Sequence, residues 1–290
     1  MSDNSAYCRE QVTKIDRDRY LSCLYAPEDK RRGLFALYAF NLEISRIREM
    51  VKDPLPGEVR LQWWLDAISG QSHGSVQDNP VAAELIYAIN QFGLPATALE
   101  SMIKARQFDL YNDPMPSLAD LEGYTGETQS LLMQMAVIIL VGYERASNYS
   151  EACGHGGVSN GITDLLVSLP WQASRRQQFI PMDVMRRNNV DQERLFSGDY
   201  NERLESAVAE MVEHAEFHQN KAFKSLSGNV GEVAPAFLPM MLNQQYWKRF
   251  RRPKNGKLHP IHPLPELKRQ WAMWNAARLL SRKEVTRVLK

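Results

Sequence analysis

Two histidines, His214 and His218, stand four residues apart beside Glu213, a spacing that places side chains on one face of a helix. Zinc sites use such imidazole pairs together with a third nitrogen, sulfur or oxygen ligand. The sequence contains no H-E-x-x-H motif and offers no obvious third ligand, so we interpret the histidines as a surface pair. Cys153 and His155 stand among glycines that would allow a tight turn between helices, and we expect no metal there either.

A second stretch with polar residues at helical spacing includes Ser45, Arg46 and Glu49. Taken by itself, this stretch is an exposed helix face with a local Arg–Glu pair. The sequence has no Ser–His–Asp order, no P-loop and no G-x-G-x-x-G motif, so nucleophilic hydrolysis and dinucleotide binding have no support.

The elements that must position these residues are helices, because apolar residues recur at helical spacing through most of the chain. Proline- and glycine-rich breaks separate the periodic stretches, and Ser117 with Asp120 is typical of a helix start. No stretch alternates for long enough to predict a sheet. Since no linker exceeds a few residues before 252–265, we expect one all-α helical bundle over residues 1–290.

Composition excludes several classes of protein. The chain has 290 residues with a net charge of +1, so no strong field favours nucleic acid. Its three cysteines show no metal-ligand spacing and fit a reducing compartment. The N-terminus does not resemble a signal peptide, and the apolar run 131–143 is too short to span a bilayer. We expect a cytoplasmic protein, with at most peripheral contact at the inner membrane.

Four segments, in their order and spacing, carry a family resemblance: 30–40 (KRRGLFALYAF), 61–64 (LQWW), 120–124 (DLEGY) and 161–181 (GITDLLVSLPWQASRRQQFIP). Together they resemble the squalene/phytoene synthase family, over about residues 15–280. The resemblance implies a helical bundle of the isoprenoid synthase type I fold. It also implies two signature helices whose aspartate clusters hold Mg²⁺ ions against a prenyl diphosphate, since hard dications prefer carboxylate oxygens.

The aspartates that the resemblance implies are missing here. The first cluster falls on Ser45, Arg46 and Glu49, and the second on Ser168 and Gln172, with Asp164 one turn earlier. In the first cluster Glu49 alone keeps a carboxylate, and Arg46 adds a positive charge. We therefore predict two degenerate motifs with no bound metal, no cofactor and no catalytic residues.

The resemblance also suggests residues of the cavity itself. Possible cavity or phosphate-binding residues are Tyr38, Tyr124, Gln129, Arg175 and Arg176. Core packing would explain the tyrosines equally well, and a charge pair at a helix end would explain the arginines. Gln129, with Glu127, would make the prenyl channel more polar or block it.

Further residues are similar to one non-catalytic branch of the family, the proteins like mitochondrial complex I assembly factor 6. They are Glu127–Ser130 (ETQS) and the segment 174–183 (SRRQQFIPMD). We predict a binding or assembly protein whose partners are respiratory complex I subunits or other assembly factors. The alternatives are a prenyltransferase that condenses two prenyl diphosphates head to head with Mg²⁺, and a module that binds an isoprenoid or another lipid. Candidates for a client surface, with core packing as the alternative, are Met240, Met241, Tyr246 and Trp247.

Overall fold

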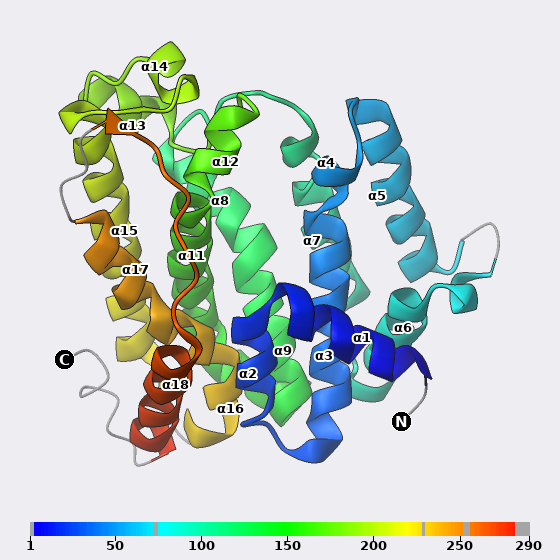
Figure 1. Ribbon diagram of the computed structural model, residues 1–290. Coiled ribbons are helices and arrows are strands. Elements are labelled where there is room, and N and C mark those ends of the chain that lie inside the picture. Colours follow the sequence, from blue (N-terminus) through cyan, green and yellow to red (C-terminus); the bar gives the residue numbers. More distant parts are fainter. Residues whose placement is uncertain (1–2, 72–74, 228–229, 252–255, 282–290) are drawn as a thin grey trace.

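A computed structural model of the protein describes residues 3–71, 75–227, 230–251 and 256–281 (Figure 1). Helices dominate these residues, which confirms the predicted all-α class. Within the described ranges there is one sheet, in which β1 (Asp199–Tyr200) pairs antiparallel with β2 (Gly256–Lys257). The sequence did not indicate these strands, because two residues are too few to show an alternating pattern.

The α-helices follow one another with short connections. Their bounds are α1 Asp3–Ile15, α2 Arg17–Cys23, α3 Glu28–Ser45, α4 Ile47–Met50, α5 Pro54–Ser69, α6 Pro80–Phe92, α7 Ala96–Ala105, α8 Leu118–Thr125, α9 Leu131–Val141, α10 Tyr143–Ala146, α11 Ser150–Val167, α12 Leu169–Ser174, α13 Met182–Arg187, α14 Gln192–Phe196, α15 Glu202–Ser225, α16 Val230–Phe237, α17 Asn243–Phe250 and α18 Glu266–Ser281. Short 3-10 helices are η1 Val76–Asp78, η2 Phe108–Leu110, η4 Ser147–Tyr149 and η5 Leu238–Leu242, and η3 Gly126–Ser130 is a π-helix.

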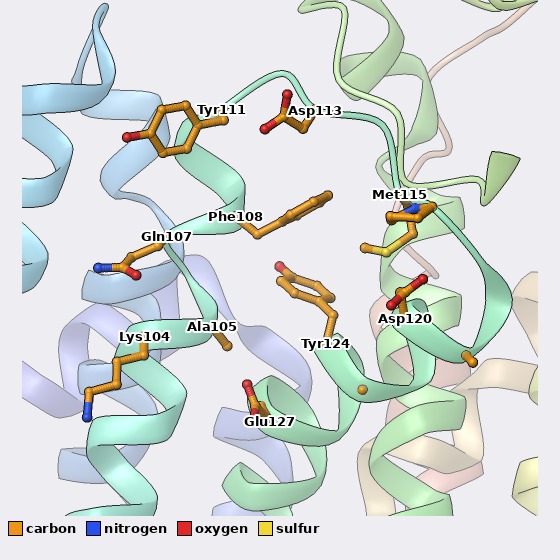
Figure 2. Close-up of a pocket in the computed structure, with 13 residues that line it drawn as sticks. Lys104, Ala105, Gln107, Phe108, Tyr111, Asp113, Met115, Asp120, Tyr124 and Glu127 are labelled. Carbon is orange, nitrogen blue, oxygen red and sulfur yellow. The ribbon is translucent and has the colours of Figure 1, made fainter.

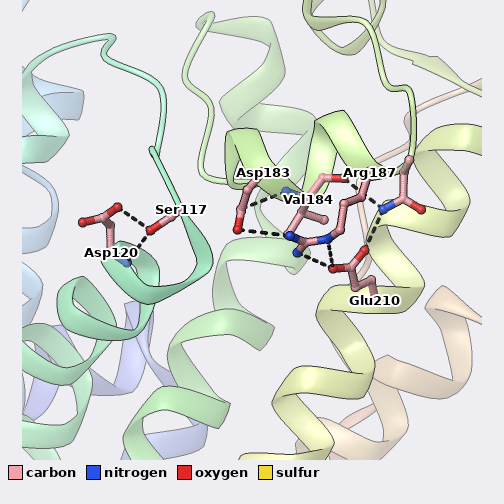
Figure 3. Close-up of polar contacts among 7 residues, drawn as sticks. Ser117, Asp120, Asp183, Val184, Arg187 and Glu210 are labelled. Carbon is pink, nitrogen blue, oxygen red and sulfur yellow. Dashed lines mark hydrogen bonds and ion pairs between the residues drawn. The ribbon is translucent and has the colours of Figure 1, made fainter.

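Polar side chains fix where several helices begin. The predicted start at Ser117 is confirmed: its hydroxyl accepts a hydrogen bond from the backbone N–H of Asp120 at 3.2 Å (Figure 3). Asn79 and Asn201 cap α6 and α15 in the same way, each accepting from two backbone N–H groups. These caps satisfy donors that have no partner within the helix.

Arg187 joins α13 to α15 through ion pairs. The Arg187 guanidinium donates to Glu210 at 2.6 Å and lies 3.3 Å from Asp183 (Figure 3). Asn188 donates to the same Glu210 carboxylate at 2.7 Å. The short helix α13 is therefore held against the long helix α15 by charge-assisted hydrogen bonds.

The glycines around Cys153 do not form a turn, and this prediction is wrong. They lie inside α11, where Gly157 faces the π-helix η3. A Cβ on Gly157 would come within 2.3 Å of the Cα of Ser130, and the Ser130 hydroxyl donates to the Gly154 carbonyl at 2.6 Å. Here glycine permits two backbones to approach closely rather than a change of direction.

The core consists of two groups of buried apolar side chains. One surrounds α3 and α9 and includes Phe40 and Ile139, and the other lies between α11 and α15 and includes Ile162 and Met211. Figure 1 shows α11 and α15 running side by side, with α1 lying across α3. The most apolar helix, α9, is buried, and among the described residues we find no helix with the length and apolarity needed to cross a bilayer.

Candidate functional site

The two signature helices, in which the predicted motifs begin, are α3 and α11. Both are interrupted where they face a common pocket. α3 ends at Ser45 and α4 begins at Ile47, while α11 ends at Val167 and α12 begins at Leu169. The second interruption follows from Pro170, which lacks the N–H that would continue the ladder of α11. The pocket, here called the motif pocket, has a volume of about 350 Å³. It is lined by Ser45, Arg48, Glu49, Arg106, Asp109, Tyr124, Leu165, Ser168, Trp171, Gln172, Gln177 and Phe179.

In the first motif, the carboxylate already has a cationic partner. The Nε of Arg46 lies 3.2 Å from the carboxylate of Glu49, and both side chains are about half exposed. The Ser45 hydroxyl donates to the backbone carbonyl of Leu42 at 3.3 Å. The first motif therefore presents to the pocket one neutralised carboxylate and one hydroxyl.

The second motif presents an amide and a hydroxyl. The side-chain N–H of Gln172 donates to the Ser168 hydroxyl at 2.7 Å and to the Leu165 carbonyl at 3.1 Å. Gln172 is buried, and its side-chain oxygen has no hydrogen-bond partner. A buried amide oxygen without a partner is costly, and it is a place where a bound ligand could donate a hydrogen bond.

A buried triad that the sequence did not indicate holds Tyr124 at the pocket wall. Arg106 donates to Asp109 at 3.2 Å and to the Tyr124 hydroxyl at 2.8 Å, and that hydroxyl donates to Asp109 at 2.6 Å. Burial raises the pKa of Asp109, while the charge of Arg106 opposes that rise. Burial also raises the pKa of Tyr124 well above its ordinary value, so the phenol stays neutral.

Tyr124 also lines a wider groove on the outer side, of about 670 Å³. Figure 2 shows Phe108, Tyr124 and Glu127 along this groove. The rings of Phe108 and Tyr124 lie 5.9 Å apart. Glu127 thus makes this outer groove polar, and it does not line the motif pocket.

Asp164 lies in a different cavity from Ser168 and Gln172. This cavity, here called the arginine cavity, has a volume of about 180 Å³. It is lined by Asp16, Asp18, Arg19, Asn160, Asp164, Pro239, Leu242, Asn243 and Tyr246. The Asp164 side chain is exposed to this cavity, yet the surrounding protein desolvates it and raises its pKa to about 6, while Arg19 opposes the rise.

Arg19, which the sequence did not indicate, brings Tyr38 and Gln129 together. Its guanidinium donates to the Asp16 carboxylate at 2.5 Å and to the Gln129 amide oxygen at 2.7 Å. It also lies 5.6 Å from the centre of the buried Tyr38 ring. Gln129 belongs to η3, so the π-helix aims this amide at a cation.

The two arginines after the second motif do not line the motif pocket. Arg175 lies 4.1 Å from the centre of the Trp171 ring. Arg176 pairs with Glu193 at 2.6 Å and has a positive φ of 57°. A phosphate in the motif pocket would therefore not meet Arg176 as it stands, because the guanidinium already has a carboxylate partner.

His214 and His218 are not a surface pair, and this prediction is wrong. His218 is 5% exposed, and its Nδ1 lies 2.9 Å from the Nδ1 of His155. Glu122 approaches both histidines of the pair, at 2.6 Å from His214 and 3.4 Å from His218. The sequence singled out the His214–His218 pair but could not indicate that Glu122 and His155 join it, because these two residues come from other helices.

The chain is similar in sequence to known proteins over most of its length. The model of the family described as squalene/phytoene synthase matches residues 12–270. The chain is 30% identical over 258 residues to rat NADH dehydrogenase (ubiquinone) complex I, assembly factor 6, covering 89% of this chain and 77% of that protein. It is 22% identical over 233 residues to the 15-cis-phytoene synthase of Synechocystis sp., covering 76% and 68% of the two chains.

The fold has close solved counterparts. A dehydrosqualene synthase crystallised with a ligand superposes with a TM-score of 0.78 at 15% identity, covering 96% of this chain and 97% of that one. The predicted isoprenoid synthase type of helical bundle is thereby confirmed. With the family match over most of its length, the chain belongs to the squalene/phytoene synthase family.

Proposed function

We propose that this protein is a non-catalytic member of its family that binds a partner during the assembly of respiratory complex I. The main support for this proposal is that the two carboxylates that line the motif pocket already have cationic partners. Glu49 is paired with Arg46, and Asp109 is paired with Arg106 and Tyr124. Neither carboxylate is available to a metal without losing its present partner.

The energetic obstacle to a metal cluster is large. A unit charge about 4 Å from another interacts by roughly 4 kcal/mol at an effective dielectric of about 20, and a dication doubles this. Arg46 would impose such a repulsion on a Mg²⁺ held by Glu49. The carboxylates that a prenyltransferase would need to rebuild a site do not meet either, since Asp164 lines the arginine cavity and Glu49 the motif pocket.

The assembly role draws support from the relatives, several of which carry the name complex I assembly factor 6 or its homolog. The test is affinity purification of the tagged chain from its native cell. We expect complex I subunits or other assembly factors to be recovered. Recovery of isoprenoid-pathway enzymes without complex I proteins would contradict the proposal.

A client needs a surface, and the candidates from the sequence offer little of one, since Met240 and Trp247 are buried and Met241 and Tyr246 are partly buried against the core. The exposed apolar face formed by α18 and the turn that follows α2 fits better. It consists of Leu24, Tyr25, Leu267, Trp271 and Trp274.

Trp271 and Trp274 are 65% and 52% exposed, so we expect the double variant W271S/W274S to lose the client while remaining folded. The matched control is Tyr143→Ser on α10, which removes an equally exposed aromatic ring elsewhere.

A second candidate function is retention of an isoprenoid or another lipid in the motif pocket. It is favoured by the unpartnered oxygen of Gln172 together with the apolar walls from Leu165 and Phe179. Native mass spectrometry of the purified protein distinguishes the two functions. A retained isoprenoid or quinone supports the binding module, whereas ligand-free protein that still recovers complex I subunits supports the assembly role alone.

A further inference from the structure

Four side chains from three helices converge beside the bundle core. Glu122 comes from α8, His155 from α11, and His214 and His218 from α15. The ligand atoms of Glu122, His214 and His218 all lie within 4.8 Å of one another, which no other trio of histidine, cysteine or acidic residues achieves in the described part of the chain. We call these four residues the histidine cluster.

The two nitrogens of His218 face different partners. Its Nε2 lies 3.4 Å from the carboxylate of Glu122, and its Nδ1 lies 2.9 Å from the Nδ1 of His155. When the Nδ1–H of His218 donates to His155, the Nε2 lone pair is aimed at Glu122. The Nε2 of His214 reaches the same carboxylate oxygen at 2.6 Å. The 2.6 Å contact is a hydrogen bond when the Nε2 of His214 carries its proton; if a cation replaces that proton, both Nε2 lone pairs and the carboxylate can bind the cation.

We propose that the histidine cluster binds one divalent transition-metal ion of the Zn²⁺ class. The ligands are the Nε2 atoms of His214 and His218 and the carboxylate of Glu122. His155 is a positioning residue that accepts the Nδ1–H of His218 and so fixes its tautomer, as outer hydrogen-bond acceptors do in zinc sites. Imidazole ligands favour Zn²⁺ over Mg²⁺, which prefers oxygen.

The surroundings suit a metal site. The side chains of Glu122 and His214 are 40% and 20% exposed, so an ion can enter, while that of His218 is 7% exposed and held in place by packing. The ring of Phe217 lies against both histidines of α15, at 5.4 Å from His218. The carboxylate oxygen of Glu122 lies 2.6 and 3.4 Å from the two Nε2 atoms, and all three ligand atoms lie within 4.8 Å of one another, whereas a tetrahedral zinc site requires roughly 3.3 Å, so side-chain adjustments of about an ångström suffice.

The site is separate from the motif pocket, because none of its four residues lines that pocket. It therefore does not rest on the proposed assembly role, and either proposal can fail without the other. With three protein ligands, a fourth coordination position would remain for water or for a side chain of a partner.

The test is titration of the chelator-treated full-length protein with Zn²⁺ in competition with a coloured chelator. We expect one Zn²⁺ per chain with a Kd below about 10 µM, and a rise in Tm on binding. E122Q and H214A should each weaken binding at least tenfold, and H155A by about 10–100-fold. H259A, which removes a histidine outside the cluster, should leave the Kd unchanged.

Two results would overturn the proposal: a wild-type Kd weaker than about 10 µM, or E122Q and H214A both binding within tenfold of the wild type. Circular dichroism of each metal-free variant guards against misfolding. E122Q is the safer variant because it keeps the shape of the side chain and one oxygen acceptor. Substitution with Co²⁺ gives an independent readout, since the visible absorption of Co²⁺ intensifies when it enters a four-coordinate site, and this increase should be seen in the wild type and lost in H214A.

Discussion

At the scale of single residues, the motif pocket is defined by which carboxylates remain and by what they contact. Ser45, Ser168 and Gln172 line one pocket with Glu49, so the two signature helices face each other although their aspartates are missing. Hydroxyl and amide groups can bind a neutral or weakly polar ligand. They cannot neutralise several dications, which is why this pocket suits binding better than ionisation of a diphosphate.

Asp164 is held in a position that favours its protonated form. Desolvation by the protein around the arginine cavity raises its pKa to about 6, so the native state becomes less stable as pH rises from about 4, where the unfolded state ionises, to about 6, where the native state also ionises. We expect D164N to raise the free energy of unfolding by about 1 kcal/mol at pH 8, a figure reduced for the water in the cavity. The gain should shrink below pH 6 and vanish near pH 4.

Urea unfolding at both pH values measures this effect. The matched control is D113N, which removes an exposed carboxylate of the outer groove. A gain for D164N that is the same at pH 4 and pH 8 would mean that ionisation of Asp164 is not its cause.

Arg106 compensates a buried charge, and its removal should be costly. R106L leaves Asp109 buried without its cation and Tyr124 without a donor, so we expect a loss of about 3–5 kcal/mol in unfolding free energy. R175L removes an arginine that lies over Trp171, and it should cost less than about 1 kcal/mol. Chemical denaturation compares the two variants, and equal losses would refute the role given to Arg106.

The sequence indicates the residues of the signature helices and the local Arg46–Glu49 pair, but not the contacts between distant helices. Glu49 and Gln172 stand in recognisable segments, whereas Arg19 meets Gln129 across 110 residues and Glu122 meets His214 across 92. Such pairs have no local pattern, because they depend on how distant helices pack. Arg19 stands ahead of the segment 30–40, where an arginine is most often a solvated charge. The sequence therefore gave no reason to single it out.

At the scale of helices, apolar periodicity predicted the all-α class, and the capping pattern predicted the start at Ser117. The glycines near Cys153 were misjudged because a glycine can serve either a turn or a close helix contact. The sequence does not distinguish these roles, since what decides between them is the neighbour: Gly157 faces the backbone of Ser130, and Gly154 faces open space.

This difference between neighbouring glycines gives a matched pair of variants. G157A places a Cβ 2.3 Å from the Cα of Ser130, so α11 and η3 must separate, and we expect a loss of at least about 1–3 kcal/mol. G154A meets nothing within 4 Å and lies in the same helix, so it should be neutral or stabilise by up to about 1 kcal/mol. Thermal unfolding ranks the two; a stable G157A would contradict the close contact.

At the scale of the whole molecule, we propose that the chain is one domain although its core has two groups of buried side chains. Trp247, with the second group, donates to Thr163 of α11 at 3.0 Å, and α11 in turn packs on η3 and α9 beside the first group. We therefore expect one cooperative transition, with coincident midpoints by tryptophan fluorescence and far-UV circular dichroism. Two separated midpoints would indicate two independent domains.

If this member of the family is non-catalytic, as we propose, it does not ionise prenyl diphosphates, and an assay of diphosphate release decides the matter. The purified protein is incubated with farnesyl or geranylgeranyl diphosphate and Mg²⁺, and released diphosphate and hydrocarbon products are measured. We predict no release above that of heat-denatured protein, because Glu49 and Asp109 are held by arginines. Turnover to a squalene-type or phytoene-type product that is lost in E49Q would contradict the account.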